Sequence, residues 1–281
     1  MNKRTKDPLQ FQEQPLQQPL TIWHVVQKGM DFAKSSFWLV VPFCFLMTTL
    51  VYGYGVQPQT IPTISDWSDV ISLLLMALGL WTLSALHASA LIQMNSSLQN
   101  RPLSLKNAMQ KGIRRSLPVF IVCLLYFALM ALAGILFVQT KNFGETTLYP
   151  EIFPYVGLVF ILPVLLLSVS FYLSLFIVVL ARHKKETPVY RKIIDYFHES
   201  VFLLSGSWWK MLGLMLLNFA VMTAIWGVYQ LLLKELVVCA VLFYLVTTSI
   251  VITFWYGCVL ALILELKAKK MEKLEMVQPA I

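Results

Sequence analysis

Long runs of apolar residues alternate with short polar segments along most of this chain. Six of the runs reach about 20 residues, the length that a helix needs to cross the hydrocarbon core of a bilayer. None of the six contains Lys or Arg, and Glu265 follows directly after the last one. The pattern predicts six transmembrane helices, at 36–55, 70–93, 117–138, 155–181, 211–233 and 236–264.

A second pattern precedes each pair of predicted spans. Polar and apolar residues recur there with the spacing of an amphipathic helix, and Thr21, Ser104 and Thr187 are the predicted N-caps. Basic residues on one face and large apolar residues on the other suit the membrane interface. The sequence therefore predicts three units, each a cytoplasmic interfacial helix followed by a transmembrane hairpin. The tripeptide Gln-Lys-Gly occurs in the first two units, at 27–29 and 110–112.

Composition supports the same fold class, an all-α integral membrane protein. Hydrophobic residues make up 58% of the chain and charged residues 13%, and the mean hydropathy is +0.71. A water-soluble domain carries about 25% charged residues, so this chain has too little polar surface to fold in water. We expect a disordered cytoplasmic N-terminus at 1–20, a six-helix transmembrane domain at 21–265 and a basic cytoplasmic tail at 266–281.

The net charge of +8 follows the membrane topology. Of the 22 Lys and Arg residues, 20 lie in the N-terminal segment, the second and fourth loops and the C-terminal tail. Cytoplasmic loops retain basic residues, so both termini are predicted to be cytoplasmic. Nucleic acid is not an expected partner, because the basic residues are dispersed among four segments. Anionic lipid headgroups are expected partners, and the candidate contacts are Lys106, Lys111, Arg114, Arg115, Arg191 and Lys192.

Polar residues inside the predicted spans are the candidates for an intramembrane site. His87 is the only histidine in a predicted span. Such a residue serves either to bind a transported proton or a polar headgroup, or to pack helices closely together. We favour packing, because no carboxylate lies in any predicted span. Asn218 is expected to join or kink helices. Ser170 is expected to satisfy a backbone carbonyl that Pro163 frees in the fourth span.

The sequence shows none of the residue patterns of membrane enzymes. Paired acids for metal-assisted phosphoryl chemistry, a His-Glu-x-x-His helix and a Ser-Lys or Asp-Asp dyad are all missing. The four histidines do not have metal-ligand spacing. We expect a protein that is not an enzyme and that needs no metal or cofactor.

Two stretches resemble recurrent segments of a group of bacterial membrane proteins. The first contains Ala85-Leu86-His87-Ala88, Arg101-Pro102-Leu103-Ser104-Leu105 and Gly112-Ile113-Arg114-Arg115, and the second contains Trp208-Trp209-Lys210-Met211-Leu212. They are similar to the YciC-like and glycerophosphodiester phosphodiesterase membrane-region-like proteins. The resemblance implies a bacterial inner-membrane location and a six-helix core. It does not imply phosphodiesterase activity, which in those enzymes resides in a separate soluble domain that this sequence does not contain.

Two functional hypotheses follow from the sequence. The first is a non-enzymatic inner-membrane protein with an accessory or structural role in the envelope or in lipid handling. The alternative is a small-solute transporter or channel subunit, which His87 and Pro163 favour. The sequence leaves open whether the chain forms a homo-oligomer or binds another membrane protein.

Overall fold

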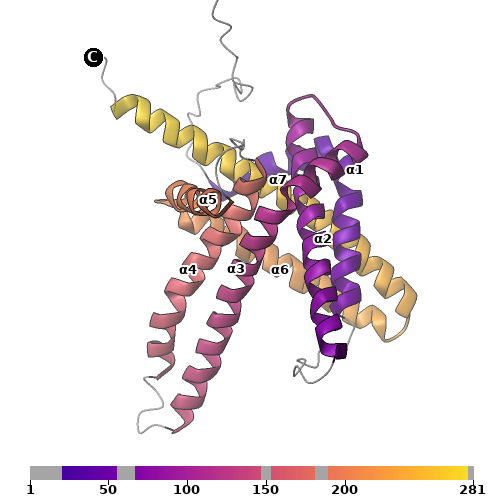
Figure 1. Ribbon diagram of the computed structural model, residues 1–281, viewed down its shortest axis with the longest axis vertical. Coiled ribbons are helices and arrows are strands. Elements are labelled where there is room, and N and C mark those ends of the chain that lie inside the picture. Colours follow the sequence, from indigo (N-terminus) through magenta and orange to yellow (C-terminus); the bar gives the residue numbers. More distant parts are fainter. Residues whose placement is uncertain (1–20, 56–66, 147–152, 181–188, 278–281) are drawn as a thin grey trace, which may run out of the picture.

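The computed structural model describes residues 21–55, 67–146, 153–180 and 189–277 (Figure 1). These residues contain no strand, which confirms the predicted all-α class. The helices in this part of the chain are α1 (Ile22–Gly55), α2 (Trp67–Leu98), α3 (Leu105–Thr146), α4 (Phe153–Leu180), α5 (Val189–Leu204), α6 (Trp208–Leu233) and α7 (Val237–Val277). The six predicted spans fall on α1, α2, α3, α4, α6 and α7.

Several of these helices are long and apolar enough to cross a membrane. Among the described residues, five stretches meet both criteria, in α1, α2, α3, α6 and α7, and α4 adds a shorter apolar stretch, Leu166–Leu180. Large apolar side chains face outward along them; in α2, Leu74 is 64% exposed and Met76 57%. A water-soluble monomer does not expose long apolar surfaces of this kind. The chain is a multi-pass membrane protein.

Two of the predicted N-caps are confirmed by hydrogen bonds. The Thr21 hydroxyl accepts a hydrogen bond from the backbone N–H of His24 at 3.2 Å, at the start of α1. The Ser104 hydroxyl accepts one from the backbone N–H of Asn107 at 3.3 Å, at the start of α3. Each cap satisfies one of the N–H groups that have no partner inside the helix. The third predicted cap, Thr187, lies outside the described residues.

The predicted interfacial helices are not three separate elements. The segments that follow Thr21 and Ser104 continue without a break into the first span of their hairpins, as α1 and α3. Only the third segment, α5, is a helix of its own. It is separated from α6 by Gly206, whose φ of +77° is a left-handed conformation that ends a helix. The first two segments contain no left-handed residue at the corresponding place.

The helix α7 lies at the centre of the molecule. Figure 1 shows it crossing the fold diagonally, and it packs mainly on α1 and α6, with α5 and α4 in contact as well. Every residue from 256 to 263 is buried. The packing partner along most of α7 is α1, which runs antiparallel to it. Tyr52 meets Tyr244 at one end of this pair, and His24 meets Glu265 at the other.

The same helix continues beyond the end of the predicted transmembrane domain. The sixth span was predicted at 236–264, and a tail from 266 onward. In the structure α7 runs to Val277, and Leu266 is buried in the core with only 2% of its surface exposed. The first part of the predicted tail is therefore a continuation of α7.

Candidate functional site

A polar cavity of about 270 Å³ lies where α2 ends, α3 begins and α4 ends. Three basic side chains line it: Arg101 from the α2–α3 connection, and Lys111 and Arg115 from α3. None of the residues lining the cavity is acidic. Its neutral polar residues are Asn95, Ser96 and Gln99. We call this cavity the basic pocket.

The connection that carries Arg101 is held by a helix C-cap. Asn100 has a left-handed φ of +53°, and the backbone N–H of Arg101 donates a 3.0 Å hydrogen bond to the carbonyl of Ser96. This is the bond pattern that commonly closes the last turn of a helix. The buried Gln93 side chain adds a 2.8 Å hydrogen bond from its Nε2 to the carbonyl of Leu103. The backbone of Arg101 is thus fixed from both sides.

Arg115 connects the basic pocket to α4 and α5. Its guanidinium donates to the carbonyl of Val179, one of the last four carbonyls of α4, which have no partner within the helix. Burial raises the pKa of the Tyr196 hydroxyl on α5, and the positive charge of Arg115 opposes that rise. Lys111 lies one turn before Arg115 on α3, where like charges repel. A bound anion would relieve that repulsion.

The structure brings only some of the predicted headgroup contacts together. Lys111 and Arg115 share the basic pocket, which also contains Arg101, a residue that the sequence analysis missed. The other candidates were identified by their helical spacing, which cannot identify a residue such as Arg101 in the connection between two helices. The remaining candidates do not line the pocket: Lys106 and Arg114 are exposed on α3, Arg191 is exposed on α5, and the side chain of Lys192 lies outside the described residues.

His87 lies on α2 and packs against α4 and α7. Its Nδ1 is 2.6 Å from the hydroxyl of Tyr256, and its ring meets Phe176 edge-on with 5.2 Å between the ring centroids. Its Nε2 is buried and makes no hydrogen bond within the described part of the chain. His87 is therefore a packed histidine with one unused nitrogen.

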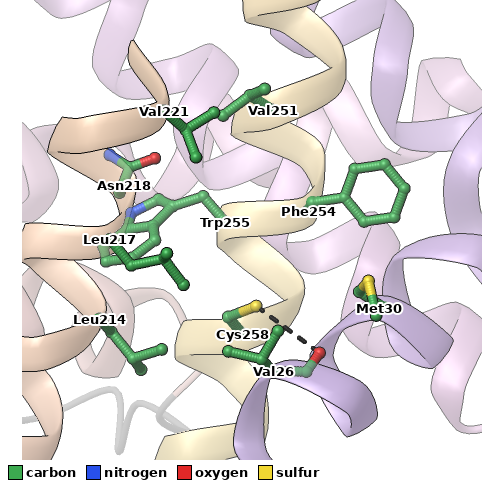
Figure 2. A pocket seen from close by; sticks show the side chains of 10 residues that line it. All are labelled: Val26, Met30, Leu214, Leu217, Asn218, Val221, Val251, Phe254, Trp255 and Cys258. Atoms are coloured by element: carbon green, nitrogen blue, oxygen red, sulfur yellow. Dashed lines mark hydrogen bonds between the residues drawn. The ribbon is translucent and has the colours of Figure 1, made fainter. Parts of the chain in front are cut away.

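The three intramembrane candidates do not form one site. Ser170 is fully buried on α4, and its hydroxyl has no hydrogen-bond partner among the described residues. Asn218 lies on α6, in the wall of a separate cavity of about 200 Å³ between α1, α6 and α7 (Figure 2). All other residues lining that cavity are apolar or Cys. We call it the lateral cavity.

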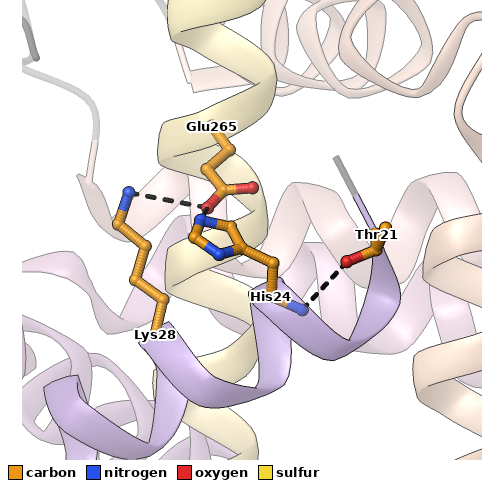
Figure 3. A network of polar contacts seen from close by, with 4 residues as sticks. All are labelled: Thr21, His24, Lys28 and Glu265. Carbon is orange, nitrogen blue, oxygen red and sulfur yellow. Dashed lines mark hydrogen bonds and ion pairs between the residues drawn. The ribbon is translucent and has the colours of Figure 1, made fainter. Parts of the chain in front are cut away.

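A cluster of two partly exposed side chains around the buried carboxylate of Glu265, at the end of the α1–α7 pair, was not predicted. Glu265 is 1% exposed, and its Oε1 lies 3.4 Å from Nε2 of His24 and 3.5 Å from Nζ of Lys28 (Figure 3). Both residues belong to the polar face of the first predicted interfacial helix. Their spacing of four residues does place them on one face of α1, but that face meets α7. The cluster holds the start of α1 against α7.

Comparison with known proteins gives no relative. No protein family, no curated protein and no solved structure matches this chain. Its function is therefore inferred from the arrangement of its own residues. The guanidinium and ammonium groups of the basic pocket have the chemistry that binds phosphate oxygens.

Proposed function

We propose that the chain crosses a bacterial inner membrane six times, with both termini in the cytoplasm. The distribution of Lys and Arg supports this topology. So do the contacts among the basic segments. The start of α1 meets Glu265. Lys267 of α7 pairs with Glu199 of α5 at 2.7 Å. These basic segments come together at one end of the helix bundle, as cytoplasmic segments would.

We propose that the protein is not an enzyme and that it binds anionic phospholipid headgroups at its cytoplasmic face. Its role would be an accessory or structural one in the envelope or in lipid handling. The observation that carries this proposal is the basic pocket, where Arg101, Lys111 and Arg115 converge with no acid among the lining residues. Each basic residue near an anionic headgroup contributes about 1 kcal/mol to binding.

Lipid titrations of the purified protein test this function. Native mass spectrometry would compare phosphatidylglycerol with phosphatidylcholine of the same chain length. We expect Arg101→Gln and Lys111→Gln each to weaken phosphatidylglycerol binding about fivefold, the loss of one headgroup contact. Lys106→Gln is the matched control, because Lys106 is exposed on the same helix and does not line the pocket.

Two results would contradict the proposal. The first is equal binding of the charged and neutral lipid, with no difference between Lys111→Gln and Lys106→Gln. The second is cleavage or transfer of a lipid by the purified protein that a point mutation abolishes, because that result would make the protein an enzyme.

A small-solute transporter or channel subunit is the second candidate function. The observation in its favour is the unused Nε2 of His87 in the core of the described helices. If this function is right, proteoliposomes containing the protein will carry a solute or proton flux that His87→Ala abolishes. Flux that is absent, or that His87→Ala leaves unchanged, would argue against it.

A further inference from the structure

The lateral cavity has the form of a site for a hydrocarbon chain. Val26 comes from α1, Leu217 and Val221 from α6, and Trp255 and Cys258 from α7 (Figure 2). The cavity thus opens between helices that are themselves membrane-spanning in length and hydropathy. In a bilayer, lipid around the protein would occupy this cavity.

One polar group interrupts this apolar wall. Figure 2 shows Asn218 projecting from α6 toward the indole of Trp255. Among the described residues, the Asn218 amide has no hydrogen-bond partner, although the cavity around it is otherwise apolar. An amide N–H₂ at hydrocarbon depth is costly to leave unpaired. An ester carbonyl of a phospholipid is an acceptor that would satisfy it.

A cationic group lies on the same face of α6, nearer the basic end of the bundle. Lys210, Leu214, Leu217 and Val221 recur with helical spacing, and the last three line the cavity. The charges of Lys269 and Glu265 on α7 act on Lys210. Lys28 lies beside Glu265 as well. Lys210 and Lys269 thus add positive charge to this region, and an additional anion would balance it.

We propose that the lateral cavity binds one anionic phospholipid from the leaflet at the basic end of the bundle. Its phosphate lies beside Lys210, its ester carbonyl accepts a hydrogen bond from Asn218, and one acyl chain continues through the cavity past Val221 and Val251. The eight helical steps from Lys210 to Asn218 span about 12 Å along α6. The flexible lysine side chain covers part of that length, so both groups reach one glycerophosphate backbone. This lipid site shares no residue with the basic pocket.

Crosslinking with a photoactivatable lipid tests the proposal. The protein would be placed in nanodiscs with phosphatidylglycerol that carries a diazirine on its acyl chain, and the labelled residues would be mapped by mass spectrometry. We expect label on the cavity residues at and beyond Asn218, which are Leu217, Val221 and Val251. Val221→Trp fills the cavity and should reduce this label at least fivefold. Ala220→Trp, on the exposed neighbouring position, should leave it unchanged.

Two milder substitutions test the polar contacts and do not depend on the folding of Val221→Trp. Lys210→Gln should lower the labelling several-fold for phosphatidylglycerol and less for phosphatidylcholine carrying the same diazirine chain, because the choline cation offsets the phosphate charge. Asn218→Leu should lower it for both lipids. Lys111→Gln should have no effect, which separates this site from the basic pocket.

The proposal fails if label is spread over the exposed faces of α2 and α6 as strongly as over the cavity. It also fails if neither Lys210→Gln nor Asn218→Leu changes the labelling. In a separate reaction with a bifunctional thiol reagent, crosslinks between two protein chains through Cys258 would show that a second copy occupies the cavity, and that result would equally overturn a lipid.

Discussion

Two glycines decide how closely neighbouring helices approach. They are the glycines of the repeated Gln-Lys-Gly tripeptide, Gly29 on α1 and Gly112 on α3. A Cβ atom added at Gly29 would lie 2.6 Å from the backbone nitrogen of Cys258 on α7, and one added at Gly112 would lie 2.7 Å from the carbonyl oxygen of Ala85 on α2. Small residues at such crossings let helix backbones pack closely in a membrane. The repeat therefore marks two equivalent helix contacts.

The substitution Gly29→Ala should destabilise the protein. Its new methyl group would collide with the α7 backbone, which cannot move aside as a flexible side chain can. We expect a loss of about 1–3 kcal/mol in the free energy of unfolding, measured by denaturant titration in detergent micelles. Gly53→Ala on the same helix is the control, since a Cβ there has no atom within 4 Å. A control as destabilised as Gly29→Ala would show that loss of any glycine in α1 is harmful.

At the scale of whole helices, each predicted amphipathic segment packs against the second helix of another hairpin. The first part of α1 packs on α7, the first part of α3 packs on α2, and α5 packs on α4. Small residues lie at every one of these contacts. In the third, the hydroxyl of Ser174 donates a 2.9 Å hydrogen bond to the hydroxyl of Ser200. The three units thus share a packing rule, although only α5 is a separate helix.

Engineered cysteines at positions 174 and 200 should form a disulfide. The hydroxyl oxygens, whose positions the sulfurs would take, are 2.9 Å apart, and small side-chain rotations can bring two sulfurs from there to the roughly 2.0 Å of a disulfide bond. In a background without the four native cysteines, we expect oxidation of the Ser174→Cys, Ser200→Cys variant to change its mobility on non-reducing gels after cleavage between α4 and α5. A pair at 168 and 200 is the control, because Ser168 lies about 9 Å further along α4. Equal crosslinking of both pairs would mean that α5 is not docked as described.

The sequence was sufficient to locate the helices but not to pair them. Helices that face lipid need long apolar runs, so six helices could be located from hydropathy. The N-caps Thr21 and Ser104 could be predicted as well, because a cap depends only on residues close in the sequence. Pairing depends on residues that are distant in the sequence. Nothing near Glu265 indicates that its partners are His24 and Lys28, more than 200 residues earlier.

The residues of the basic pocket could likewise be predicted only in part. Lys111 and Arg115 could be predicted, because they share one face of a periodic helix. Arg101 could not, because a left-handed Asn100 and a hydrogen bond from Gln93 determine where its connection runs. A break between α5 and the fifth span was predicted, but its position at Gly206 was not, since a glycine in sequence does not reveal whether its φ is positive.

At the scale of the whole molecule, the longest helices exceed the thickness of a bilayer. The 42 residues of α3 and the 41 of α7 extend about 60 Å at 1.5 Å per residue, whereas the hydrocarbon core is about 30 Å thick. Parts of both helices must lie outside that core or tilt strongly within it. Four of the five basic residues of α3 are in its first three turns, with Lys141 near its end, and those of α7 are in its last turns. Both helices therefore have a charged part beside an apolar part.

Reporter fusions test the proposed topology. Alkaline phosphatase, which is active only outside the cytoplasm, should be active when fused after Gly55 and after Val138, and inactive when fused after Asn100. A fluorescent protein that folds only in the cytoplasm should give the opposite pattern at the same three positions. Cytoplasmic signals after both Gly55 and Val138 would overturn the six-span arrangement and the lipid leaflet assigned to each cavity.

The antiparallel pairing of α1 with α7 has a consequence for biosynthesis. Among the described helices, α1 leaves the ribosome before all others and its main partner α7 leaves after them. Until α7 has been made, His24 and Lys28 do not have the Glu265 carboxylate to meet, and the face of α1 that carries Gly29 lacks its partner. The α1–α7 contact can therefore form only after α7 has been inserted, and α1 must wait in the bilayer, or beside an insertion factor, for its counterpart.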